Sequence, residues 1–241
     1  MEQSGASTRL AGAVQDLMSE LVSALRSGDR FRLAGRVMDG DGPEAAPDPA
    51  LAAVRVVGAD AVLPSVLLRC APPEPADLTV FARAVHAWPP PADAPPTSLW
   101  SHWAMRRALL RLDASLDGAP NNAPDDGNEP GAQWLDTAPW QFLTHQLAVL
   151  APLALPGEDC AVARVARGRP VDVARGFVRA VRRRDWLQAA GAGRWLALLD
   201  GVPETLGLDT GLEFVAQMGG EDARVAFQVR AAQLMRTRVP V

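Results

Sequence analysis

The chain has 241 residues, of which 48% are apolar and 22% are charged, and these fractions exclude a wholly disordered protein. This length allows one large domain or two small ones. The formal net charge is −4 at pH 7 and the pI is about 5.4, so the global balance favours neither nucleic acid nor an anionic membrane as a partner.

The choice of basic and aromatic residues is unusual. All 24 basic residues are arginines, and lysine, isoleucine and tyrosine are absent. These three residues have AT-rich codons, so their absence predicts a bacterial source with a GC-rich genome. It also excludes a lysine Schiff base and acid–base catalysis by a tyrosine phenol.

The sequence contains no pattern typical of export or of a membrane span. Residues 1–7 are polar and are not followed by the long apolar run of a signal peptide. The apolar stretch at 147–155 is much shorter than the ~18–20 residues of a membrane helix, and it contains Pro152. We expect a cytoplasmic protein without a membrane segment.

The first predicted helix has one apolar stripe and a clear end. Gly28 follows the stripe and suits the left-handed conformation that often ends a helix. The stripe is suited to packing on the rest of the protein or on a partner helix. Its members are spaced three or four residues apart: Leu10, Val14, Leu17, Leu21 and Leu25.

The region from 30 to 70 is the one where strands remain an alternative. Residues 39–47 have loop composition, and Asp48 followed by Pro49 is typical of a helix start. We expect Gly58 to end that helix and a second helix to follow. The apolar run at 59–68 also suits a buried strand, and 32–37 is the other strand candidate.

The middle of the chain contains two predicted helices and then a linker. The first helix spans 75–88 and ends before three prolines, and the second spans 99–116. Residues 117–133 contain no large apolar side chain and are rich in Pro, Gly and Asn. We therefore predict a flexible linker at 117–133 between an acidic N-terminal part, 1–116, and a C-terminal part, 134–241.

The second part is also helical in pattern, and no convincing alternating strand occurs in it. With the first part it gives about nine or ten short helices, which predicts a mostly α fold. Two architectures suit such a series, an irregular helical bundle and HEAT-like stacked helix pairs. The further predicted helices span 137–150, 161–167, 170–184, 186–199, 205–218 and 221–236.

An arginine-rich helix is the sharpest local feature. Residues 164–184 contain eight arginines and one acid, Asp172. We place valines such as Val171 and Val178 on the opposite face from the arginines. This face suits solvent, an acidic protein partner, or the phosphates of a nucleic acid; the last is disfavoured by the net charge. The candidate partner-binding residues share one face: Arg175, Arg179, Arg182 and Arg183.

Residues able to bind a metal are few and scattered. His86, His102 and His145 lie on different predicted helices, and no His-x-His, HExxH or CxxC motif occurs. Cys70 and Cys160 lie in apolar stretches and are typical of buried thiols. We therefore predict no metal and no cofactor. The candidate ligand-binding residues are Trp100, His102, Trp103 and His145.

No phosphate-binding loop, dinucleotide-binding motif or GxSxG nucleophile motif occurs, so the sequence favours a non-catalytic function. We expect a helical protein-interaction or regulatory protein of the adaptor type. Its partner would be another protein, an acidic one among the candidates, or a second copy. The alternatives are a small-ligand-binding protein or enzyme with a site near His102 and His145, and a nucleic-acid binder that uses helix 170–184.

Overall fold

The computed structural model describes residues 2–35, 48–68, 73–116 and 129–237, and all regular elements within these ranges are helices. The predicted mostly α fold is therefore confirmed. The chain forms two compact units, and the division between them falls within helix α5 (Pro96–Leu116). Unit 1 comprises residues 1–94 and 101–126, and unit 2 comprises residues 95–100 and 127–241.

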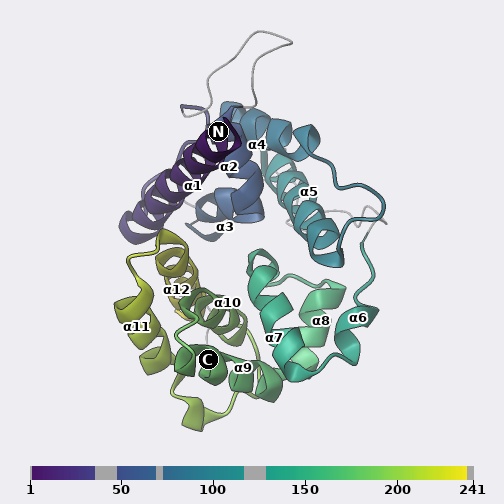
Figure 1. Cartoon of the computed structure of the whole chain (residues 1–241), viewed down its shortest axis with the longest axis vertical. Helices are drawn as coiled ribbons and strands as arrows, with labels where there is room; N and C mark the ends of the chain where they lie inside the picture. Colours follow the sequence, from purple (N-terminus) through teal and green to yellow (C-terminus); the bar gives the residue numbers. More distant parts are fainter. Residues whose placement is uncertain (1, 36–47, 69–72, 117–128, 238–241) are drawn as a thin grey trace. The chain divides into compact units, whose positions relative to one another are not determined.

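Unit 1 is formed by helices that pack on α1. In this unit α1 contacts α2 and α3, and α2 also contacts α4 (Figure 1). The later part of the predicted apolar stripe, Leu17, Leu21 and Leu25, is buried there, and Gly28 adopts a φ of 79° after the helix ends. The helices are α1 (Glu2–Ser27), α2 (Pro49–Val57), the 3-10 helix η1 (Gly58–Val62), α3 (Leu63–Leu68), α4 (Pro75–Ala87) and most of α5.

The helical interpretation of 59–68 is confirmed, since η1 and α3 cover this segment. The Asp48 carboxylate accepts a hydrogen bond from Ala50 N at 2.8 Å, and Gly58 ends α2 with a φ of 71°. The strand candidate at 32–37 is wrong for residues 32–35, which are irregular; residues 36 and 37 lie outside the described ranges.

One helical stretch within the described ranges is long and apolar enough to cross a membrane by length and composition alone. It spans Pro49–Leu68, the segment of α2, η1 and α3. It is not the apolar stretch at 147–155 that was considered in the sequence. The helical path continues through Arg55 and Asp60, so the apolar residues on both sides of these charges form one longer stretch. Of the most apolar 18 residues of this stretch, 56% are buried inside the fold.

Unit 2 is organised around α10, which contacts α7, α9, α11 and α12 (Figure 1). Small residues make this possible, because residues 189–193 are all alanine or glycine and all are buried. The elements of the unit are α6 (Gln133–Asp136), α7 (Trp140–Val149), η2 (Ala151–Leu153), α8 (Ala161–Gly168), α9 (Pro170–Arg182), α10 (Trp186–Leu196), η3 (Glu204–Leu206), α11 (Leu208–Gly219) and α12 (Ala223–Arg236).

Two glycines mark the close approaches of α7 to its neighbours. A Cβ atom added to Gly176 of α9 would lie 2.1 Å from the Thr144 side chain, and one added to Gly191 of α10 would lie 2.8 Å from the Ala148 carbonyl oxygen. The Gly-Ala-Gly segment at 191–193 is thus a close-packing site inside a continuous helix and not a helix break.

The predicted helix from Thr137 to Leu150 begins later than expected. Thr137 follows the last residue of the short helix α6, and α7 begins at Trp140 after Pro139. Of the predicted linker, residues 117–128 lie outside the described ranges. Gly131, near its end, accepts a hydrogen bond from the indole nitrogen of Trp100 at 3.2 Å.

Candidate functional site

An open groove of about 580 Å³ runs along α9 on unit 2. Trp140 of α7 and three residues that precede α11, Pro203, Thr205 and Leu206, complete its lining. Glu204 lies between them in the chain and is exposed, but it does not line the groove. The α9 side chains that line it are Val171, Ala174, Arg175, Val178, Arg179 and Arg182.

The expected position of the valines opposite the arginines is wrong. Val171, Arg175, Val178 and Arg182 are separated by four, three and four residues, so they lie on a single helix face. Val171 is 46% exposed and lines the groove with the arginines. The side of α9 that packs into the core is the opposite one, which carries buried residues such as Phe177.

The arginines of the groove have few acidic partners. Arg175 Nη1 lies 3.5 Å from Asp172 Oδ1, while the other oxygen of Asp172 is held by Arg169 at 2.7 Å. The Arg179 guanidinium lies over the ring of Trp140, 5.7 Å from its centroid. Among the described residues that line the groove, none carries a carboxylate.

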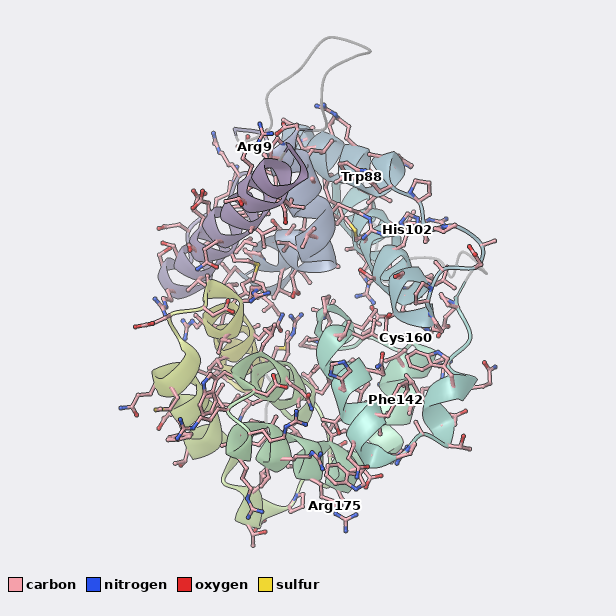
Figure 2. All side chains as sticks on the ribbon, in the orientation of Figure 1. Arg9, Trp88, His102, Phe142, Cys160 and Arg175 are labelled. Atoms are coloured by element: carbon pink, nitrogen blue, oxygen red, sulfur yellow. The ribbon has the colours of Figure 1, made fainter. Side chains whose placement is uncertain are left out.

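The fourth arginine predicted to bind a partner lies at the edge of this arrangement. Arg183 follows the last residue of α9 and is exposed, but it does not line the groove. The structure therefore brings Arg175, Arg179 and Arg182 together at one site and leaves Arg183 outside its lining. Arg175 lies at the surface of unit 2 in Figure 2.

The residues of the predicted ligand site are divided between the units. Trp100 and His145 belong to unit 2, whereas His102 and Trp103 belong to unit 1. Trp100 is fully buried and Trp103 is 5% exposed, so both are core residues. His145 is exposed, and its Nδ1 lies 3.4 Å from Gln188 Oε1. None of these four residues lines the groove of α9, and their role in ligand binding stays a prediction.

His102 lies on α5 (Figure 2), where the charges of Arg55, Arg106 and His86 of unit 1 act on it. Arg55 of α2 donates from its Nε to the carbonyl of Trp88, just after α4 ends, at 3.3 Å. Partial burial of the imidazole lowers the pKa of His102, and the charges of Arg55, Arg106 and His86 lower it further. The neutral form of His102 is therefore favoured in the folded chain.

We expect this histidine to make unit 1 less stable in mild acid. Because the pKa of His102 is lower in the folded state, the unfolded chain takes up the proton first as the pH falls below about 6.5. The free energy of unfolding then decreases with falling pH until the folded chain is protonated as well. Chemical denaturation at a series of pH values should show a smaller decrease for His102→Gln than for the wild type.

The control for that experiment is His145→Gln, which removes an exposed histidine from unit 2. If His102→Gln and the wild type lose stability equally between neutral and mildly acidic pH, His102 is not the group responsible.

Cys160 does not offer a reactive thiol. Cys160 is fully buried, and burial raises the pKa of its thiol to about 12, so the thiolate is not formed at neutral pH. Cys70 lies outside the described ranges. Within those ranges no group of three or more His, Cys, Asp or Glu side chains is arranged to hold a metal ion.

Two contributors to the groove were missed in the sequence. Trp140 lies 30 residues before the start of α9, and Pro203, Thr205 and Leu206 begin 21 residues after its end. No spacing rule relates either to the arginines. The exposed Val171 was detectable, because its four-residue separation from Arg175 already places both on one face.

No family model, no curated protein and no solved structure matches this chain.

Proposed function

We propose that this chain is a non-catalytic interaction protein and that the groove of α9 binds an acidic segment of a partner protein. One observation carries this proposal, namely three arginines around an open groove whose described lining contains no carboxylate. Carboxylates of a partner would add counter-charges for Arg179 and Arg182 and a second one for Arg175, whose contact with Asp172 is long at 3.5 Å. They would form charge-assisted hydrogen bonds, which are bidentate in the best geometry.

The exposure of the arginines supports a docking role over a structural one. The side chain of Arg175 is 62% exposed, and Arg179 and Arg182 are exposed as well. Arg169, in contrast, is largely covered, and it bonds both Asp172 and the carbonyl of Ala138. The arginine just before α9 is thus held by the fold, whereas the three that line the groove are exposed, with one long ion pair at Arg175 and one ring contact at Arg179.

Replacing Arg175, Arg179 and Arg182 together by alanine should weaken the binding of acidic peptides roughly tenfold or more, because each exposed charge pair contributes up to about 1 kcal/mol. The measurement is fluorescence anisotropy with labelled glutamate-containing peptides. Wild-type binding should weaken as the ionic strength rises above about 0.1 M, where charges more than ~10 Å apart are screened.

Arg183→Ala is the matched control, since it removes an adjacent exposed arginine that lies outside the lining. It should leave peptide affinity within about twofold of the wild type. A single-stranded oligonucleotide of equal charge serves as the competing ligand. Preferential binding of the oligonucleotide with the same arginine dependence would replace the proposal, and failure of every acidic peptide to bind would end it.

A further inference from the structure

We infer that the groove of α9 recognises a short acidic segment through an apolar anchor side chain and does not bind acidic surfaces in general. This inference rests on the proposed function and specifies the chemistry of the partner. It requires three features of the groove, which are its apolar lining, its size and the spacing of its charges.

The lining is as apolar as it is cationic. Val171 leaves nearly half of its surface in water at 46% exposure, and Val178 and Leu206 are partly exposed beside it. Trp140 adds an aromatic ring whose face is already engaged by Arg179. An apolar side chain placed here gains free energy by leaving water, and a purely acidic chain does not.

The size of the groove limits what enters it. A volume of about 580 Å³ lies within the range of roughly 300–1,000 Å³ that is typical of sites for one small ligand. A few side chains therefore suffice to fill the groove, and the face of a folded domain would cover it without filling it.

The spacing of the arginines also indicates that the partner segment is short. From Arg175 to Arg182 the axis of α9 rises about 10 Å, at ~1.5 Å per residue. An extended peptide covers that distance in about three residues. Because alternate side chains of an extended peptide face the same way, the partner segment needs an apolar residue at position i+2 between carboxylates at i and i+4, a stretch of about five residues.

Three labelled peptides of equal length test this inference. One contains glutamate and leucine, the second has serine in place of leucine, and the third has glutamine in place of glutamate. We expect the first to bind about tenfold more tightly than either of the others, because it alone makes both kinds of contact.

The protein variants separate the apolar contribution from the charge. Val171→Ser should lower the affinity for the glutamate–leucine peptide by about threefold to tenfold and leave the affinity for the glutamate–serine peptide unchanged. Val149→Ser is the matched control, because Val149 is a 53% exposed valine of α7 in the same unit that does not line the groove. Both positions are exposed, so neither substitution should alter the helical circular dichroism.

Equal affinity for the glutamate–leucine and glutamate–serine peptides, with binding still lost in the triple arginine variant, would overturn this inference and leave the proposed function intact. If the glutamine–leucine peptide bound as tightly as the glutamate–leucine peptide, both the inference and the proposed function would be overturned, because charge would then be dispensable. An effect of Val149→Ser as large as that of Val171→Ser would also overturn the inference, since the groove would not be the binding site.

Discussion

Gly191→Ala is expected to destabilise unit 2 by about 2–3 kcal/mol, although alanine is the better helix former by about 1 kcal/mol. The new methyl group would lie 2.8 Å from the carbonyl oxygen and 2.9 Å from the Cα of Ala148. Both are backbone atoms, so no side-chain rotation relieves the overlap. Helix α7 must therefore move away from α10, which is the central helix of the unit.

Thermal and denaturant unfolding measure this effect, and two other glycines serve as controls. A Cβ atom at Gly168, the last residue of α8, or at Gly12 within α1 meets no atom within 4 Å. Gly12→Ala should be neutral or stabilising by up to about 1 kcal/mol, because it removes backbone freedom from the unfolded chain. An increase in stability for Gly191→Ala as well would show that α7 and α10 do not approach each other as described.

Asp77→Ala is expected to destabilise unit 1 by about 3 kcal/mol, because it leaves two backbone donors without their acceptor. Asp77 is 5% exposed, and its Oδ1 accepts hydrogen bonds from Leu33 N at 2.7 Å and from Ala34 N at 2.9 Å. These bonds attach the irregular segment after α1 to the start of α4. Asp77→Asn keeps an acceptor oxygen and should lose less, about 1 kcal/mol.

The control for Asp77 is its neighbour Glu74, which joins the same two segments at the surface. Glu74 pairs with Arg30 at 2.9 Å and with Arg32 at 2.8 Å, and the side chains of all three residues are at least 36% exposed. Glu74→Ala should therefore cost less than about 1 kcal/mol. If denaturant unfolding gives Asp77→Ala and Glu74→Ala the same small loss, the buried carboxylate does not hold the segment.

The helices were largely predictable because their signals are local. Asp48 with Pro49 marks the start of α2, and Gly28 marks the end of α1, through backbone and capping preferences that act within a few residues. The start of α7 was misplaced because Thr137 suits a helix start by residue type alone. Pro139, which precedes Trp140, is the residue after which the helix begins.

The buried acid and the glycines were not predictable to the same degree. Asp77 resembles any acidic residue in a first helical turn, and its two backbone donors lie more than 40 residues earlier in the chain. Gly191 offers only a choice between helix break and close packing, since the atom that decides it belongs to α7. In both cases the partner is distant in sequence, and local propensity does not identify it.

The sequence by itself determined that this protein is built from short helices and that arginines gather on one face of residues 170–184, because periodicity and charge are properties of neighbouring residues. Only the tertiary structure decided which of those arginines share a groove. Packing Phe177 and its neighbours into the core turns Val171 outward with Arg175, Arg179 and Arg182. It also brings Trp140, Pro203, Thr205 and Leu206 beside them. The physical reason is that a groove is formed by several elements, and their association depends on how distant side chains fit together.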